Sequence, residues 1–119
     1  MKQVSFISVE DEDPDLILSF AIWHPELDDV RSLILLRTPK YEVFLDEAER
    51  GVNVSYEPWI SDQDEMLKRV ELHDEMITII TTDRRFDLDI SKVDEEEIEE
   101  AKKILNRMNF DDRFEIKIV

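Results

Sequence analysis

Residues 86–98 read Phe-Asp-Leu-Asp-Ile-Ser-Lys-Val-Asp-Glu-Glu-Glu-Ile, and this stretch holds both kinds of element that build the domain. In 86–90 apolar and acidic residues alternate strictly, which places every apolar side chain on one face of a strand. At Asp94 the pattern changes, because an Asp suited to cap a helix is followed three residues later by Glu97. The stretch therefore predicts a half-buried strand followed by a helix that begins at Asp94.

The predicted helix covers residues 94–108 and is amphipathic. Its first turn is acidic, while Lys102, Lys103 and Arg107 lie near its end, which matches the helix dipole. Asn106 and Asn109 are suitable terminators. We expect the helix to pack one apolar stripe on a sheet. The stripe consists of Ile98, Ala101, Ile104, Leu105 and Met108.

The rest of the chain has the pattern of β-structure. Residues 66–72 and 76–82 predict a hairpin with its turn at 73–75, and residues 16–23 are apolar enough for a strand near the sheet centre. We predict a mostly antiparallel sheet of about seven strands, and at most eight, with the C-terminal helix packed on it. The predicted strands lie in 4–9, 16–23, 33–36, 52–56, 66–72, 76–82, 86–90 and 114–118.

Two details of this assignment are less regular. Residues 40–50 fit either a strand or a helical spacing, and we favour a short helix or an irregular loop that ends at Gly51. Trp23 ends an apolar strand and is expected in the core.

The four prolines stand singly at the edges of elements, and no linker or repeat interrupts the chain. Residues 1–119 therefore predict one α+β domain.

The charge of the chain excludes several classes of function. Its formal net charge is −16 at pH 7 and its few Lys and Arg form no cluster, which argues against nucleic-acid binding. An anionic membrane surface is disfavoured by the same sign, and no apolar run is long enough to span a bilayer. Acidic residues begin at Glu10, so the start lacks the apolar core of a signal peptide. We expect a cytoplasmic protein.

Two residue types are scarce in a way that limits chemistry. The chain has no cysteine, which excludes thiol catalysis, thiolate metal sites and disulfides. Gly51 is the single glycine, and loops that cradle phosphate need several. We therefore expect no nucleotide or other cofactor.

Candidate metal and catalytic residues are weak. Residues 11–15 place Asp at positions 1, 3 and 5 of a calcium loop, but Leu16 and Ile22 stand where that loop needs Gly and Glu. His24 and His73 lack zinc spacing and read as surface or turn histidines. We expect no metal site, no catalytic residue and no enzyme. A hydrolase that uses His24 or His73 with a carboxylate stays open as a weaker alternative.

Candidate partner-binding residues cluster in one acidic segment. Residues 57–65 place Trp59 and Ile60 among polar and acidic residues, next to Tyr56. A loop Trp either folds back over the core or anchors an interface, where Trp and Tyr contribute strongly to binding. The acidic helix face formed by 95–100 is a second docking candidate, beside its ordinary role in solubility. The predicted partner-binding residues are Tyr56, Glu57, Trp59, Asp62, Asp64 and Glu65.

Several segments between Leu16 and Met108 share their order and their patterns of hydrophobicity and turns with a known family. They are Leu18-Ser19-Phe20-Ala21, Leu33-Ile34-Leu35-Leu36-Arg37, residues 46–57, the hairpin of residues 70–80 and the helix that begins at Asp94. Over about three quarters of its length the chain thus resembles the Immunity protein 10 family, small cytosolic bacterial proteins associated with polymorphic toxin systems.

The resemblance implies a protein that neutralises a cognate toxin by binding it. An acidic domain suits this role, because its carboxylates can pair with the Lys and Arg of a basic toxin groove. We therefore expect a basic protein partner, such as a toxin domain. The alternative is a structural or assembly domain that forms a homodimer through the edge strand at 114–118.

Overall fold

The computed structural model describes residues 1–57 and 65–119 of the chain. Within them each predicted strand segment contains or overlaps a strand, and the predicted helix is found at residues 95–108 with Asp94 as its N-cap. The elements are β1 (Lys2–Glu12), β2 (Asp15–His24), β3 (Asp29–Arg37), the 3-10 turns η1 (Pro39–Phe44) and η2 (Glu47–Glu49), β4 (Asn53–Tyr56), β5 (Leu67–Leu72), β6 (Met76–Thr81), β7 (Arg85–Asp89), α1 (Glu95–Met108) and β8 (Glu115–Ile118).

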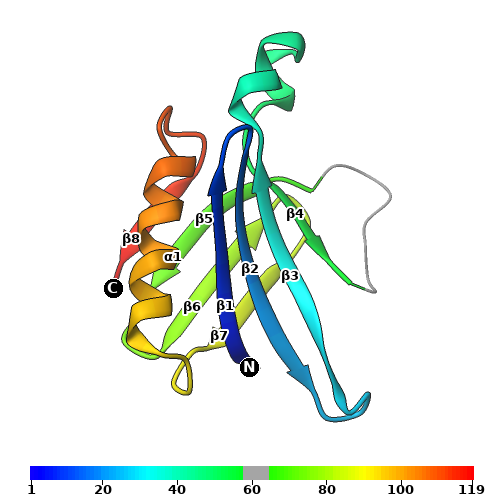
Figure 1. The fold of residues 1–119 in the computed structure, drawn as a ribbon, viewed down its shortest axis with the longest axis vertical. Helices are drawn as coiled ribbons and strands as arrows, with labels where there is room; N and C mark the ends of the chain where they lie inside the picture. Colours follow the sequence, from blue (N-terminus) through cyan, green and yellow to red (C-terminus); the bar gives the residue numbers. More distant parts are fainter. Residues whose placement is uncertain (58–64) are drawn as a thin grey trace.

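All the named strands join one mixed sheet in the order β4-β3-β2-β1-β7-β6-β5-β8, in a single compact α+β domain (Figure 1). Neighbours are antiparallel from β1 to β4 and from β5 to β7. Two pairings are parallel, β1 with β7 and β5 with β8. The predicted mostly antiparallel character is confirmed, with eight strands against about seven expected.

The sheet folds over so that its two halves face each other. Figure 1 shows β1, β2 and β3 crossing in front of β5, β6 and β7, with α1 beside β1. One hydrophobic cluster fills the interior and draws side chains from both halves and from α1. The first half and α1 therefore form one layer, and the strands from β5 to β8 form the layer behind it.

The start of α1 is where the sequence predicted it, but its capping differs. Asp94 is the N-cap residue, yet its carboxylate makes no capping hydrogen bond. Glu97 does not reach back to the cap either, because its Oε1 accepts the backbone N–H of Ile7 at 2.6 Å. Ile7 lies on β1 beyond the short pairing with β7, so its N–H needs an acceptor from elsewhere. Glu97 thus joins α1 to an edge of β1.

The prediction that Trp23 lies in the core is wrong. Trp23 points out of the sheet and keeps 37% of its surface exposed. Side chains at alternate positions of β2 face the interior, and Leu18 and Phe20 are fully buried there. The opposite face of β2 and β3 is not covered by another layer, so most of its residues are half-buried or exposed, although the small Ala21 is buried. The continuous apolar pattern of 16–23 therefore belongs to one covered face and one open face.

Residues 38–50 form an arm that projects beyond the sheet between β3 and β4 (Figure 1). Its two 3-10 turns agree with the prediction of a short helix or irregular loop, and Pro39 begins the first of them. The arm rejoins the sheet through Gly51, whose φ of 132° is a conformation that residues with a side chain rarely adopt. The single glycine of the chain therefore ends the arm.

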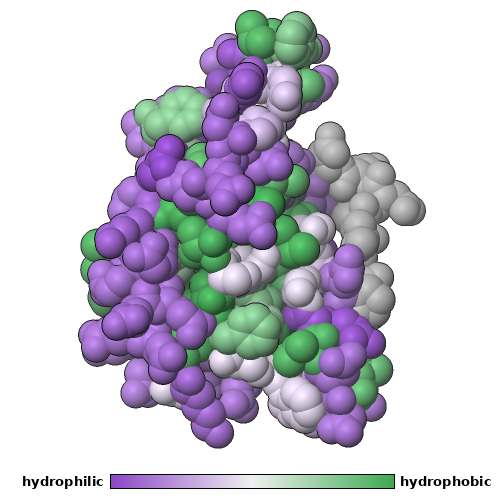
Figure 2. Space-filling model, viewed as in Figure 1, coloured by the Kyte–Doolittle hydropathy of each residue, from purple (hydrophilic) through white to green (hydrophobic). Residues whose placement is uncertain are grey.

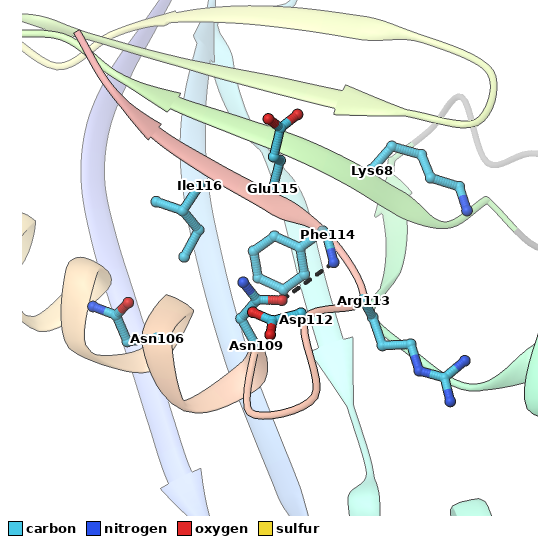
Figure 3. Close-up of a pocket in the computed structure, with 8 residues that line it drawn as sticks. All are labelled: Lys68, Asn106, Asn109, Asp112, Arg113, Phe114, Glu115 and Ile116. Carbon is cyan, nitrogen blue, oxygen red and sulfur yellow. Dashed lines mark hydrogen bonds between the residues drawn. The ribbon is translucent and has the colours of Figure 1, made fainter.

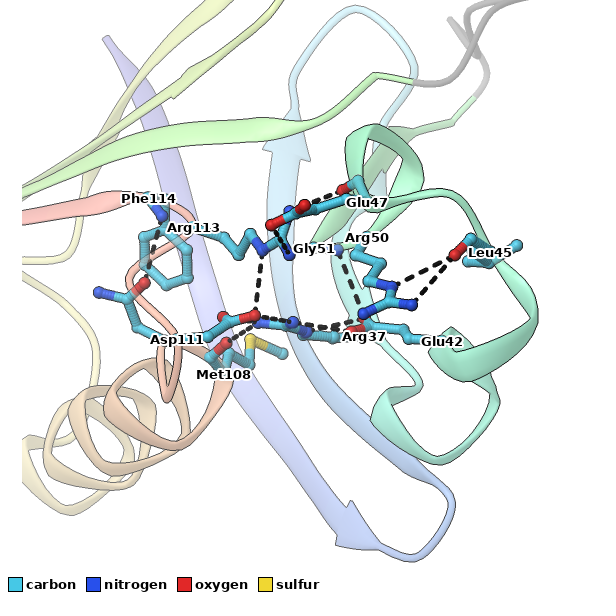
Figure 4. Close-up of polar contacts among 11 residues, drawn as sticks. Arg37, Glu42, Leu45, Glu47, Arg50, Gly51, Met108, Asp111, Arg113 and Phe114 are labelled. Carbon is cyan, nitrogen blue, oxygen red and sulfur yellow. Dashed lines mark hydrogen bonds and ion pairs between the residues drawn. The ribbon is translucent and has the colours of Figure 1, made fainter.

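A buried arginine holds the arm in place. Arg37 is fully buried at the end of β3, and its guanidinium donates to both carboxylate oxygens of Glu42 at 2.7 and 2.8 Å. It also donates to both carboxylate oxygens of Asp111 at 2.8 and 2.9 Å and to the carbonyl of Met108 at 2.7 Å (Figure 4). These bonds use every donor position of the guanidinium and connect β3, the arm and the end of α1.

The surroundings of Arg37 extend this network. The Glu42 carboxylate accepts the backbone N–H of Gly51 at 3.3 Å, and Arg113 donates to Asp111 at 3.0 Å. The ring of Phe110 lies over the guanidinium, with its centroid 4.2 Å from Cζ. Hydrogen bonds from Arg37 and Arg113 lower the pKa of Asp111 to about 2, against the opposing effect of burial. Asp111 therefore stays ionised and paired at neutral pH.

We expect Arg37→Met to lower the free energy of unfolding by about 3–5 kcal/mol, because it leaves Glu42 and Asp111 without their buried cation. Urea denaturation monitored by circular dichroism measures the change. Arg31→Met is the matched control on the same strand, since its ion pair with Asp29 is largely solvated and should contribute less than about 1 kcal/mol. Equal losses in both variants would contradict a special role for Arg37.

The lowered pKa of Asp111 predicts acid sensitivity with a definite sign. Its carboxylate has a pKa of about 2 in the fold against 3.8 in the unfolded chain, so its contribution is complete above about pH 4. That contribution is lost as the pH falls through about 2. Urea midpoints measured between these pH values should fall less in Asp111→Asn than in the unsubstituted protein. A fall as steep in Asp111→Asn as in the unsubstituted protein would contradict this role of the Asp111 carboxylate.

Candidate functional site

Half of the predicted partner-binding residues lie in the described part of the chain. Tyr56 ends β4 and is 3% exposed, Glu65 is 2% exposed, and Glu57 is exposed to solvent. Trp59, Asp62 and Asp64 lie outside the described residues. Partner binding by this segment stays a prediction, and the structure gives its two buried members contacts within the domain.

Tyr56 bonds to a buried histidine. Its hydroxyl lies within hydrogen-bond reach of His24 Nε2, and the two rings stack with centroids 5.8 Å apart. His24 Nδ1 lies 3.1 Å from Glu26 Oε1, and because an ionised carboxylate can only accept, Nδ1 is the donor in this contact. His24 is only 5% exposed, so the expectation of a surface or turn histidine is wrong. It ends β2 with its side chain turned toward the interior.

The sequence of contacts from Glu26 to His24 to Tyr56 resembles a proton relay, but its last member is poorly suited to attack a substrate. Burial, followed by the charge of Glu26, raises the pKa of Tyr56, and Arg84 only partly opposes this. A nucleophile or base would need a lowered pKa instead. The three residues are therefore suited to hold β2 against β4. That this protein is not an enzyme stays a prediction.

Glu65 is buried and has a half-buried cationic partner. Arg84 donates to its two carboxylate oxygens at 2.6 and 3.0 Å, and the Thr81 hydroxyl donates to it at 2.5 Å. Burial alone would raise the pKa of Glu65, but these hydrogen bonds outweigh it and lower the pKa. Glu65 is thus an ionised carboxylate that ties the start of β5 to the β6–β7 turn.

A cavity of about 440 Å³ lies beside these two clusters. It gathers cations in an otherwise acidic chain, because Lys2, Arg84 and Arg85 line it together with His24 and Glu26. Two of these cations already have carboxylate partners, since Arg84 binds Glu65 and Arg85 lies 3.2 Å from Asp87. The ring of Tyr56 lies 5.4 Å from the Lys2 ammonium. The positive charge of this cavity is therefore largely balanced within the domain.

A larger hollow of about 570 Å³ separates the end of α1 from β8 (Figure 3). Its lining mixes charges of both signs, with Lys68 and Arg113 near Asp112 and Glu115. Asn109 caps α1 and accepts the backbone N–H of Phe114 at 3.2 Å, so its side chain fixes the turn into β8. This hollow offers no concentrated charge or apolar surface to a ligand.

Two further features of the described residues are the placement of metal-ligating side chains and the length of apolar helices. Among residues 1–57 and 65–119, no group of three or more His, Asp or Glu side chains is placed to hold a metal ion. The acidic residues 11–15 lie in and beside the β1–β2 turn. In the same residues no helix is long and apolar enough to cross a membrane.

The outer face of β1–β4 is the most unusual surface of the molecule, and we call it the open face. The register places its residues side by side across four strands, and several are apolar although half-buried or exposed. Figure 2 shows an apolar patch on this side, within a mostly hydrophilic surface. The open face consists of Phe6, Ser8, Ile17, Ser19, Ala21, Trp23, Val30, Ser32, Ile34, Leu36, Asn53 and Ser55.

None of these open-face residues is charged, although 39% of the chain is. Phe6 is 51% exposed, and Ile34 and Leu36 are half-buried. Carboxylates begin at its border. Glu10 pairs in register with Ile17 and so ends the row of Ile17, Leu36 and Asn53, while Glu12 continues β1 and Glu57 follows β4. An uncharged, partly apolar sheet surface with acidic borders is typical of an interaction surface.

The arm carries further exposed apolar side chains. Tyr41 is 52% exposed, Val43 69%, Phe44 82% and Leu45 39%. Figure 2 shows apolar surface at the tip of the arm, above the open face. Because Arg37 fixes the base of the arm, these side chains stand on a supported element rather than on a free loop.

Most cations of the chain are already paired, which leaves the excess of carboxylates to dominate the surface. Arg37 and Arg84 are engaged by buried carboxylates, and Arg107 pairs with Asp11 between α1 and β1. On α1, Lys102 lies 3.3 Å from Glu99 and Lys103 lies 3.5 Å from Glu100. A chain with net charge −16 therefore presents few free cations to an approaching molecule.

We expect Tyr56→Phe to lower the free energy of unfolding by about 1–3 kcal/mol, because Nε2 of the buried His24 loses its hydrogen bond with the Tyr56 hydroxyl. Thermal or urea unfolding measures the loss. Tyr41→Phe removes the same hydroxyl from an exposed ring and should change stability by less than about 0.5 kcal/mol. A Tyr56→Phe protein as stable as the Tyr41→Phe protein would show that the His24 contact contributes nothing.

Comparison with known proteins adds no relative, since no protein-family model, no curated protein and no solved structure matches this chain. What the molecule does is therefore argued from its own surfaces and charges.

Proposed function

We propose that this protein is an acidic, non-catalytic binding protein that neutralises a cationic protein partner by covering that partner's active groove. The observation that carries the proposal is the open face, an uncharged and partly apolar surface on a chain of net charge −16. A toxin domain is the partner class that the resemblance to immunity proteins implies.

The open face favours a macromolecular partner over a small ligand. A sheet surface of this kind is broad and rigid, because its side chains stand on hydrogen-bonded strands in register from β1 to β4. Apolar groups such as Phe6 and Trp23 gain free energy when a partner removes them from water. Serines between them offer hydroxyls without the desolvation cost of a buried charge.

The charge of the surroundings favours a cationic partner. A net charge of −16 attracts a basic protein over a distance and orients it before contact, which raises the association rate. The same charge disfavours two copies that meet through their open faces, since the acidic borders would then face each other. Trp59, Asp62 and Asp64 lie outside the described residues and stay predicted partner-binding residues.

A homodimer through β8 is the second candidate, and one observation supports it. β8 ends the sheet order, and Ile118 on it is 82% exposed. An edge strand with exposed apolar side chains can pair with the same strand of another copy. This candidate uses a different surface from the open face, so substitutions can separate the two.

We expect Ile34→Lys to weaken binding of the cationic partner more than tenfold, because it places a buried charge in the interface. Ile118→Lys changes the net charge equally on β8 and should leave the affinity within about twofold. Titration calorimetry measures the affinity of both variants for the folded cationic protein that co-purifies at low salt. For the unsubstituted protein, raising the salt from about 0.05 to about 0.5 M should weaken the complex about tenfold.

The opposite pattern would favour the second candidate. A dimer in sedimentation that Ile118→Lys dissociates, with no salt-sensitive complex of a cationic protein, would contradict the proposed function.

A further inference from the structure

A hollow of about 300 Å³ lies where the open face meets the arm. The open face contributes Leu36 and Asn53, which are paired in register between β3 and β4. The arm contributes Tyr41, Leu45 and Glu49. The hollow is thus a concave end to an otherwise flat surface, and it belongs to the same side of the molecule.

The lining of this hollow combines three kinds of chemistry. Leu36 and Leu45 provide apolar walls, and the 52% exposed Tyr41 provides an aromatic ring. Glu49 provides an exposed carboxylate, and within the described residues no ion pair engages it. Its neighbour on the arm, Glu47, lies 3.5 Å from Arg113 instead.

The other charged side chains near the hollow make hydrogen bonds within the domain. The carboxylate of Glu42, which also lines it, is held by both nitrogens of the Arg37 fork. The guanidinium of Arg50 donates to the carbonyl of Leu45 at 3.2 and 3.3 Å and so closes the arm on itself (Figure 4). Glu49 is therefore the carboxylate that an incoming cation would meet.

We propose that this hollow binds an arginine side chain of the cationic partner. The aliphatic stem of the arginine lies against Leu36 and Leu45, and its guanidinium reaches Glu49 and the face of Tyr41. A planar guanidinium bonds a carboxylate with two donors and stacks on an aromatic ring, which a lysine ammonium does not do. The inference rests on the proposed function and adds to it the residue type that the partner presents.

The hollow is formed before any partner arrives. Arg37 and Glu42 fix the base of the arm, and Gly51 adopts the positive φ that brings the chain back into β4. A bound arginine therefore does not have to order the arm, which removes one cost of binding.

The inference is tested with the full chain and a blocked tripeptide, acetyl-Gly-Arg-Gly-amide, in a titration followed by ¹⁵N–¹H NMR. We expect the largest shifts at the amides of Leu45, Gly51 and Asn53. The matched peptides contain citrulline, which has the shape of arginine without its charge, or lysine. Both should bind at least about threefold more weakly than the arginine peptide.

Two matched variants locate the charge. Glu49→Gln should raise the dissociation constant of the arginine peptide about fivefold, because it removes the carboxylate of the hollow. Asp46→Asn removes the same charge from an arm residue outside the lining and should change it less than about twofold. Equal effects of the two variants, shifts centred on the acidic face of α1, or equal binding of lysine and arginine would each overturn the assignment.

The test is independent of the proposed function. If a cationic protein binds through the open face but Glu49→Gln leaves the affinity for the arginine peptide unchanged, only the assignment of the hollow as an arginine site is refuted. Binding of the peptide at the hollow without any salt-sensitive complex of a cationic protein would refute the proposed function alone.

Discussion

The buried guanidinium of Arg37 is the constraint on which the rest of the structure depends. Arg37 is the last residue of β3 and faces the interior, where apolar side chains are usual. Its charge is tolerated there because Glu42, Asp111 and the carbonyl of Met108 accept hydrogen bonds from all of its donors. The interaction joins the arm to the end of α1, so the position of the arm relative to the open face follows from it. A hydrophobic residue would fill the space but could not fix the arm, because apolar contacts have no direction.

The division of charge has a consequence for function. Many cationic side chains form ion pairs within the domain, as Arg84 does with Glu65, while the excess of carboxylates remains at the surface. The residues that form the open face are uncharged, in contrast to the acidic surface around them. A protein that needed only solubility would place charges on that face too. An uncharged patch surrounded by carboxylates supports a role in which contact with a cationic molecule is the activity.

Local sequence patterns predicted the elements well because the signals are themselves local. Alternation at 86–90 and the Asp94 start of α1 depend on neighbours within one or two turns. The errors concern residues whose role depends on distant partners. His24 looked like a turn residue, but Tyr56, far along the chain, buries it. The sequence held one sign that Arg37 is buried, because it continues the inward alternation of Leu33 and Leu35. That sign could not be interpreted without the structure, which places Glu42 and Asp111 around the guanidinium. The hollow beside Glu49 combines β3, β4 and the arm, and no local pattern marks it.

The sequence by itself determined that this chain forms one acidic α+β domain with a C-terminal amphipathic helix, since composition and periodicity decide charge, burial potential and element type. Only the tertiary structure decided that one face of β2 and β3 stays uncovered, that α1 lies beside β1, and that the arm projects beyond the end of the open face. The physical reason is that a period of two residues tells which side chains share a face of a strand, whereas the layer that covers that face is supplied by segments far away in the chain.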